Sequence, residues 1–362
     1  MPANGAWKGR SMSCRTATSC IFVSTYSIRF STTFRKRPMA AQTHAISGRR
    51  AYGFSLALLA CVIWGLFPIA AKSVLLELDV HTLNFYRFAL AGALLLPFMY
   101  SRRQLDILKR SREPNVRMRM FLCAALLIAN YFFYANGVKR VTPEGTQILI
   151  QLATILLLLS GVFFFGEVFT RRQWLGCAVF VIGLVAFFHP RILIMLEGVD
   201  SYGIGMGLIV LAAVSWTSYA ILQKQLLSHM TSSQVMIVIY LLGTAAFLPF
   251  AHPAQISSLD TPTILVLVFC GASTVLGAGS FAEALAHLEA SRVSAVLATL
   301  PLFTVGFMWF FSQWPQFSIE AEPMTPGTVA GAVLVVFGAL MVARTSESGR
   351  PADLPDEPHG AG

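Results

Sequence analysis

Ten long apolar stretches run through the chain, and they limit how it can fold more than any other feature. Each is about 18 to 24 residues long, and a helix of that length crosses a hydrocarbon core of roughly 30 Å. Backbone groups in lipid must be paired within the segment, and the stretches are too long and too continuously apolar for barrel strands. The sequence therefore predicts ten transmembrane helices, near 52–71, 81–100, 118–138, 145–165, 173–189, 205–223, 234–251, 263–286, 293–311 and 326–343.

The composition agrees with a chain that lies in lipid. Apolar residues make up 56% of the 362 positions and charged residues only 12%, too few to cover the surface of a soluble protein of this length. The six cysteines are scattered without a CxxC pair, which disfavours a zinc site or a disulfide framework. HExxH, GxSxG and Walker-type patterns do not occur in the sequence. We therefore expect a small-molecule substrate and a lipid bilayer as partners, with no catalytic residue, metal, cofactor or nucleic acid.

The basic residues between the stretches are unevenly distributed. With a cytoplasmic N-terminus, the outer segments hold only Lys72, Lys139, Arg140 and Arg191. Cytoplasmic loops carry the excess of Lys and Arg in membrane proteins, so both termini are predicted to lie inside. The basic residues of the inner segments are Arg49, Arg50, Arg102, Arg103, Lys109, Arg110, Arg112, Arg117, Arg119, Arg171, Arg172, Lys224, Arg292 and Arg344.

Residues 1–50 differ in kind from the rest, with nine Lys or Arg and no acidic residue. They resemble a transit peptide, which would place the protein in an organelle membrane. The alternative is an over-extended start, with Met39 as the first residue and a multi-pass protein in the plasma (inner) membrane. The tail over 345–362 is rich in Pro, Gly, Asp and Glu, and is predicted to be disordered.

Three pairs of similar segments occur in the same order in the two halves of the chain. They are "WGLFPIAAK" (64–72) with "WTSYAILQK" (216–224), "LATILLLLSGV" (152–162) with "LATLPLFTVGF" (297–307), and "LGCAVFVIGLV" (175–185) with "AGAVLVVFGAL" (330–340). They define an internal repeat over 51–190 and 203–344 with five predicted helices in each copy. An odd number of helices places the second copy upside down in the membrane, as in many secondary transporters.

These features resemble the EamA family of the drug/metabolite transporter superfamily over about residues 51 to 344. The resemblance rests on the two five-helix repeats, a first helix with Trp in each copy, the second helix "LNFYRFALAGALLLP" and a Gly-Glu link before the fifth helix. The second copy departs from this pattern, with Ala321 in place of Gly166 and about ten extra residues before Glu322. The resemblance implies an all-α integral membrane protein with ten transmembrane helices that exports a small metabolite, amino acid or drug.

Two rival functions are an integral-membrane enzyme that acts on lipid and a receptor or channel. Inverted repeats argue against both, because this duplication builds access from two sides to one central site. Without a nucleotide motif, we expect alternating access driven by a gradient or by exchange. Proton coupling would require a carboxylate in the pathway, for which Glu144 and Glu283 are the candidates. Transport by substrate exchange and assembly into a homodimer are both left open by the sequence.

A polar stripe marks the fourth predicted helix. Glu144, Gln147 and Gln151 recur at intervals of three and four, followed by Thr154 on the same face. A polar face in lipid points inward, either to line a central cavity or to bond neighbouring helices. The other residues expected to line that cavity are Trp64, Asn130, Tyr131, Tyr134 and Trp216, with core packing as the alternative for the two tryptophans.

Arg87 lies about two turns inside the second predicted helix. A charge at this depth is costly unless it faces a cavity or a partner. It either reaches outward or closes an ion pair between helices, or it binds an anionic substrate or gates the pathway. Its counterpart in the second copy falls near Ile239, so it has no symmetry mate, which favours a functional role.

The last helix of each repeat carries further signals. Glu167 and Glu322 precede it by about one turn, where a carboxylate favours a helix N-terminus, and Thr170 and Thr325 are expected to cap it. Substrate or proton contact is the alternative for both glutamates. Glycines with a seven-residue spacing predict close contact of these helices, and two prolines mark places where helices can break. These residues are Gly176, Gly183, Gly331 and Gly338, and Pro68 and Pro301.

Overall fold

The computed structural model describes residues 50–102, 113–165, 170–198, 200–227, 229–288, 290–315 and 317–345. These residues form α-helices, two short 3-10 helices and loops, and no strand occurs among them. The N-terminal stretch, the C-terminal tail and Glu167 lie outside the described residues, so the predictions made for them stay predictions.

Helices cover all of the predicted apolar stretches. The first half of the chain contains α1 (Arg50–Val74), α2 (Val80–Ser101), α4 (Pro114–Arg140), α5 (Pro143–Ile150), α6 (Leu152–Phe165) and α7 (Arg171–Glu197). The second half contains α8 (Ser201–Leu226), α9 (Ser232–Phe247), α10 (Thr261–His287), α11 (Ala290–Leu297), α12 (Leu300–Phe311) and α13 (Pro326–Thr345). The 3-10 helices η2 (Leu248–Phe250) and η3 (Pro253–Ser258) lie between α9 and α10.

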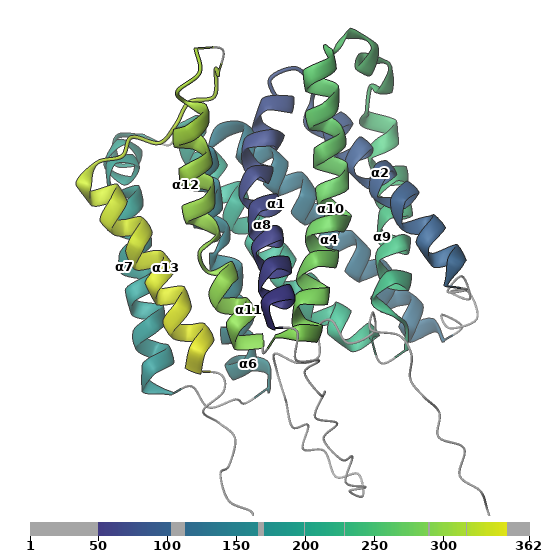
Figure 1. Ribbon diagram of the computed structural model, residues 1–362, viewed down its shortest axis with the longest axis horizontal. Helices are drawn as coiled ribbons and strands as arrows, with labels where there is room; N and C mark the ends of the chain where they lie inside the picture. Colours follow the sequence, from purple (N-terminus) through teal and green to yellow (C-terminus); the bar gives the residue numbers. More distant parts are fainter. Residues whose placement is uncertain are drawn as a thin grey trace, which may run out of the picture.

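Seven of the described helices are long and apolar enough to cross a membrane, namely α1, α2, α4, α7, α8, α9 and α10. Two shorter apolar segments are Ala295–Phe311, which covers the end of α11 and all of α12, and Pro326–Val342 of α13. α1 begins and α13 ends at the same edge of the bundle, the lower one in Figure 1. The chain is thus an all-helical, multi-pass membrane protein, while the count of ten crossings stays a prediction.

Two of the predicted helices are each broken into two pieces. The fourth divides into α5 and α6 at Gln151, and the ninth divides into α11 and α12 at residues 298–299. Pro301 lies in the first turn of α12, where its missing N–H is tolerated, so the break predicted there is confirmed. The break predicted at Pro68 is wrong, because α1 continues through it. Neighbouring helices and local adjustment accommodate a proline inside a membrane helix.

The four predicted glycines bring α7 and α13 into close contact, which is confirmed by their backbone distances. A Cβ atom added at Gly183 would lie 2.6 Å from the backbone nitrogen of Val335. One added at Gly338 would lie 2.6 Å from the backbone nitrogen of Phe180. Small residues therefore let the two backbones approach, and α7 and α13 run side by side at one edge of the bundle (Figure 1).

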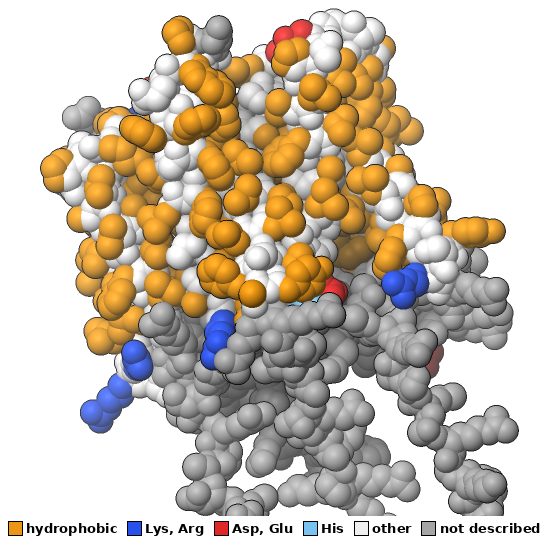
Figure 2. Space-filling model, viewed as in Figure 1, with side chains coloured by type: hydrophobic (Ala, Val, Ile, Leu, Met, Phe, Trp, Pro, Cys, Tyr) orange, Lys and Arg blue, Asp and Glu red, His pale blue; other side chains and the backbone are white. Residues whose placement is uncertain are grey.

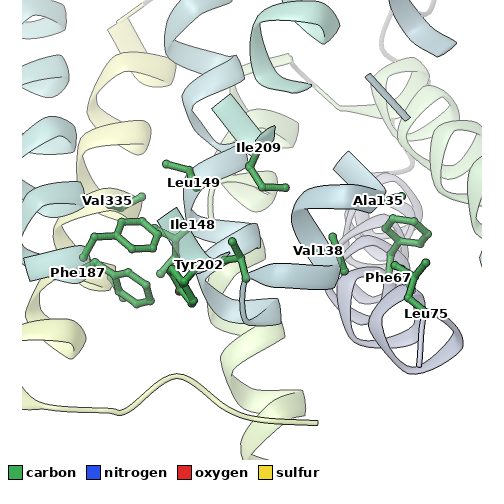
Figure 3. Packing of buried hydrophobic residues seen from close by; sticks show 14 of the residues in the cluster. Phe67, Leu75, Ala135, Val138, Ile148, Leu149, Phe187, Tyr202, Ile209 and Val335 are labelled. Atoms are coloured by element: carbon green, nitrogen blue, oxygen red, sulfur yellow. The ribbon is translucent and has the colours of Figure 1, made fainter. Parts of the chain in front are cut away.

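Apolar side chains fill the interior and also cover the outside. The largest buried cluster draws on α1, α4, α5, α7, α8 and α13, and includes Phe67, Leu75, Ala135, Val138, Ile148, Leu149, Phe187, Tyr202, Ile209 and Val335 (Figure 3). The visible outer face is largely apolar between its two ends, and basic side chains gather along its lower edge (Figure 2). Such a continuous apolar surface requires lipid around it. Exposed examples are Leu94, Phe121, Ile182, Leu241 and Phe337.

Candidate functional site

The Arg87 guanidinium lies between two aromatic rings. Its central carbon is 4.2 Å from the ring centroid of Phe67 on α1 and 4.2 Å from that of Tyr131 on α4. The residue is only 6% exposed, and Nε is buried without a hydrogen-bond partner among the described residues. The rings stabilise the cation through their negative faces. Arg87 therefore neither reaches outward nor closes an ion pair within the described part of the chain.

Helices of both halves meet around this charge. Tyr134 of α4 stacks on Phe67 with ring centroids 5.7 Å apart. From the second half, Tyr240 of α9 and Cys270 of α10 are close enough to interact electrostatically with Arg87. The predicted cavity residues Tyr131 and Tyr134 are thus brought together with Arg87 at the contact between the halves.

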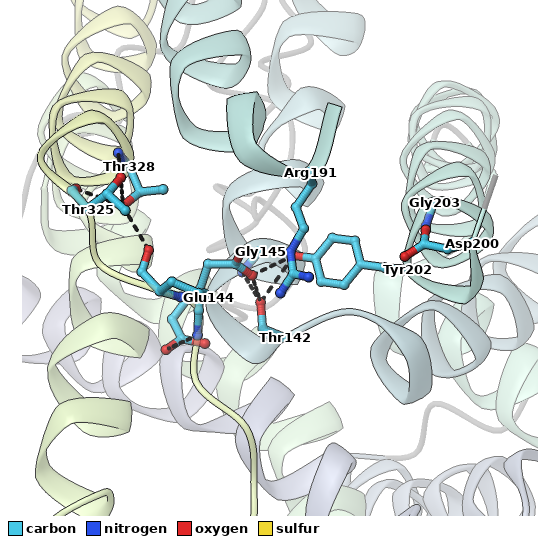
Figure 4. Close-up of polar contacts among 11 residues, drawn as sticks. Thr142, Glu144, Gly145, Arg191, Asp200, Tyr202, Gly203, Thr325 and Thr328 are labelled. Atoms are coloured by element: carbon cyan, nitrogen blue, oxygen red, sulfur yellow. Dashed lines mark hydrogen bonds and ion pairs between the residues drawn. The ribbon is translucent and has the colours of Figure 1, made fainter. Parts of the chain in front are cut away.

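A second polar group lies where α5 and α8 begin and α7 ends. Glu322, in the extended segment before α13, accepts hydrogen bonds from Thr142 and Tyr202 at 2.6 Å each through Oε2. Its Oε1 pairs with Nε of Arg191 at 3.1 Å, and the Arg191 guanidinium also lies over the Tyr202 ring (Figure 4). Glu322 is 4% exposed and both of its oxygens accept hydrogen bonds, while the Arg191 side chain is 22% exposed. The carboxylate side of this ion pair is therefore buried. We call Thr142, Glu144, Arg191, Tyr202 and Glu322 the Glu322 cluster.

Glu144 is the least satisfied member of the Glu322 cluster. It is 1% exposed; Oε1 accepts a long hydrogen bond, 3.4 Å, from the backbone N–H of Glu322, and Oε2 is buried without a partner among the described residues. Lys72 interacts electrostatically with both carboxylates, while its Nζ donates to the carbonyl of Val141 at 2.5 Å. Glu320 also interacts electrostatically with Lys72 and with Arg191, so three carboxylates and two basic side chains share one end of the bundle.

The capping role expected for Glu322 is wrong, whereas the caps expected from the two threonines are confirmed. Thr170 forms a capping box with Gln173 at the start of α7. Thr325 accepts a hydrogen bond from the backbone N–H of Thr328 at 3.2 Å at the start of α13. The Glu322 carboxylate accepts its hydrogen bonds from Thr142, Arg191 and Tyr202 instead of from the first backbone N–H groups of α13.

The polar stripe of the fourth predicted helix does not continue as one face. Glu144 and Gln147 are buried on α5, but Gln151 ends that helix and Thr154 is exposed on α6. A stripe based on a period of 3.6 residues holds only while the helix is unbroken. The break at Gln151 therefore separates the buried pair from Thr154.

The remaining predicted cavity residues have packing contacts. Asn130 donates to the carbonyl of Ala212 at 2.8 Å, which joins α4 to α8. The indole of Trp64 lies against Gly277 of α10, and Trp216 packs beside the buried cluster formed by α2, α4, α8 and α9. These three are not gathered around Arg87 by any described contact.

Glu283, the other candidate for proton coupling, lies at the opposite end of the bundle from Glu144. Its Oε1 is 3.3 Å from Nε2 of His287, one turn later on α10, and its side chain is 44% exposed. The His287 ring packs on Tyr52 near the start of α1, with centroids 5.1 Å apart. The two candidate carboxylates are therefore not brought together.

Several members of the two sites carry no signal in the sequence that marks them as functional residues. Phe67, Thr142 and Tyr202 are ordinary apolar or capping residues by pattern, and Arg191 was counted only as an outer basic residue. Two features of the sequence could have pointed to the Glu322 cluster: the acidic residues Glu320 and Glu322, and the single arginine, Arg191, at the end of an apolar stretch. Neither feature shows which residue it contacts, because the contacting residues lie far apart in the sequence.

Comparison with protein families gives a match to the EamA-like transporter family over residues 51–188 and 203–344. A solved crystal structure shares the fold with a TM-score of 0.56 and 16% identity, covering 82% of this chain and 99% of that one.

Curated relatives agree with the family match. YhbE, an inner membrane transporter of Escherichia coli (strain K12), is 33% identical over 289 residues, which are 80% of this chain and 90% of that protein. A protein of Salmonella typhimurium named "Probable amino-acid metabolite efflux pump" is 27% identical over 298 residues, 78% of this chain and 92% of that one. These relatives are named as transporters or pumps rather than enzymes. The chain accordingly belongs to the EamA-like transporter family and is a membrane transporter of metabolites.

Proposed function

We propose that the protein is a secondary exporter of small metabolites, built from two inverted five-helix repeats that give alternating access to a site between them. The observation that carries this proposal is the way the halves pack. α1 packs against α10, and α8, the repeat counterpart of α1, packs against α4, the counterpart of α10. α2 packs against its own counterpart α9, and α7 packs against α13. Exchanging the two halves turns each of these four contacts into another of the four or into itself, as expected for a two-fold relation between repeats.

The substrate site in this proposal is the space around Arg87, Tyr131 and Tyr134. These side chains are buried or half-buried, come from α2 and α4, and lie beside Tyr240 and Cys270 of the other half. A movement of one half against the other would change the electrostatic interactions of Arg87 with Tyr240 and Cys270. The Glu322 cluster would then close one end of the pathway, since it ties the segment before α13 to α5, α7 and α8.

Amino-acid metabolites are the first substrates to test, because two relatives are named as efflux pumps for them. The protein in proteoliposomes, supplied with a panel of amino acids, organic anions and cationic drugs, is expected to move at least one of them without ATP. A lipid-modifying activity in the same preparation would instead support the rival enzyme function. Transport that requires ATP would contradict secondary transport.

The topology in this proposal has both termini in the cytoplasm of a plasma (inner) membrane. Reporter fusions placed after residues 110 and 200 are expected to report opposite sides, because an odd number of crossings separates the two positions. Alkaline phosphatase and green fluorescent protein activities measure the two sides independently. The same side for both fusions would contradict the inverted repeat.

Proton coupling in this proposal depends on Glu144 rather than on Glu283. Glu144 is buried with one oxygen unpartnered, so its charge depends on its surroundings, whereas Glu283 is half-exposed and paired with His287. Glu144→Gln is expected to abolish acceleration of transport by an imposed pH gradient while substrate exchange continues, because the amide keeps the shape but not the titration. Glu283→Gln is the matched control and should retain the acceleration. Unchanged gradient-driven transport in the double variant would remove both residues from coupling.

A further inference from the structure

Three buried polar atoms without a partner lie along one face of α2. They are Nδ1 of His81, Oδ1 of Asn84 and Nε of Arg87, and none of them has a hydrogen-bond partner among the described residues. Residues three apart in a helix lie one above the other, so the three side chains form a ladder that leads from the start of α2 into the bundle. A buried donor or acceptor without a partner costs free energy, and three of them in a row indicate a group that binds there.

An open, basic pocket lies at the His81 end of this ladder, where α2 begins. It has a volume of about 430 Å³, and its lining contains no carboxylate. Two of its lining residues, Lys139 and Arg140, carry positive charge, and His81, the first residue of the ladder, also lines it. Asp79, which accepts a hydrogen bond from the backbone N–H of His81, and Asp200, which precedes Ser201, are near the pocket but not in its lining. The positive charge in the lining attracts anionic ligands. The complete lining is Val80, His81, Asn136, Lys139, Arg140 and Ser201.

The pocket and Arg87 share the same wall on α4. The His81 ring lies 5.6 Å from that of Phe132, and Asn136 donates to the carbonyl of Phe132 at 2.9 Å. One residue earlier, the carbonyl of Tyr131 accepts from Asn84 at 3.2 Å, and the ring of Tyr131 covers Arg87. Asn84 is fully buried, so in this conformation it blocks the path from the pocket to the Arg87 guanidinium.

We propose that the Arg87 guanidinium binds the carboxylate of a small organic anion, and that the pocket beside His81 is where this anion enters or leaves the bundle. This inference rests on the proposed transport function and names its substrate class. The two aromatic rings cover the faces of the guanidinium, which leaves its edge for a planar, bidentate acceptor. Arg87 has no carboxylate partner among the described residues, and a buried cation in this situation is best compensated by an anion that the protein carries.

The experiment measures binding to the purified full-length protein in detergent. Each probe is a carboxylate with its neutral amide: isovalerate with isovaleramide, benzoate with benzamide, and N-acetyl-leucine with N-acetyl-leucinamide; inorganic phosphate is the competing anion. At least one carboxylate is expected to bind at least about tenfold more tightly than its amide, or about 1.4 kcal/mol. Arg87→Met, which keeps the length but not the charge, should lose that preference.

A second pair of variants keeps the test decisive if Arg87→Met does not fold. Lys139→Gln and Arg140→Gln change the pocket without touching Arg87, and together they should slow carboxylate association several-fold at low salt and leave amide binding unchanged. The inference is overturned if no carboxylate of the panel binds, if the Arg87→Met protein binds carboxylates as the wild type does, or if only phosphate binds.

Transport in proteoliposomes separates this inference from the function on which it rests. If amides are carried as fast as carboxylates, the protein is a transporter and the carboxylate site is wrong. If carboxylates bind through Arg87 and no solute is carried under any gradient, the anion site is right and the proposed transport cycle is wrong.

Discussion

Replacement of Glu322 by alanine is expected to lower the stability of the detergent-solubilised protein by about 3 kcal/mol, which is the lower end of the range for breaking a buried ion pair. The truncation leaves the Arg191 guanidinium without its counter-ion and removes the acceptor of the Thr142 and Tyr202 hydroxyls. Arg191 keeps some exposure and its contact with the Tyr202 ring, which places the loss at that lower end. The apparent melting temperature should fall by about 4 °C.

Glu320 provides the matched control, because it lies two residues earlier in the same extended segment and is exposed. Glu320→Ala should change stability by less than about 0.5 kcal/mol, as for most exposed positions. Arg191→Met added to Glu322→Ala should cost little more than Glu322→Ala alone, since the pair is already broken. Equal destabilisation by Glu320→Ala and Glu322→Ala would show that the ion pair does not hold this end of the bundle together.

The helices could be predicted well from the sequence because a membrane helix depends on a local property, the hydrophobicity of consecutive residues. A run of about twenty apolar residues is sufficient, and every such run became helix. The breaks at Gln151 and before Leu300 were harder to predict, since only the second has a proline beside it. At Gln151 the chain interrupts its helix without a local breaker, so tertiary packing decides the break and the sequence does not show it.

The sites show the same limit more clearly. Glu322 binds Thr142, Arg191 and Tyr202 across 180, 131 and 120 residues of sequence. No periodicity joins positions in an extended segment to the ends of three helices, so the local pattern favoured a cap. Arg87 was found because a charge inside an apolar stretch is visible locally, yet its aromatic neighbour Phe67 looks like any other core residue.

The close contact between α7 and α13 leaves no room for a side chain at Gly331. A leucine at Gly331 is expected to prevent the two helices from packing and to reduce the yield of folded protein severely. A Cβ atom at this position would lie 2.7 Å from the Cα of Phe187 and 2.8 Å from the carbonyl oxygen of Gly183, both of them backbone atoms that cannot turn aside. Leucine favours a helix over glycine by roughly 1 kcal/mol. The overpacking cost of about 3 kcal/mol or more exceeds this gain, so destabilisation wins.

Gly327→Leu is the control on the same helix, because a Cβ atom there meets nothing closer than 3.7 Å. It should leave the yield and the melting temperature unchanged or slightly raised, since only the gain in helix propensity operates. Size-exclusion chromatography of the fluorescently tagged proteins in detergent measures both quantities for the two variants. If Gly331→Leu and Gly327→Leu behave alike, α7 and α13 do not pack at this distance in the membrane. If only Gly331→Leu fails, the seven-residue glycine pattern is required because it lets two backbones touch.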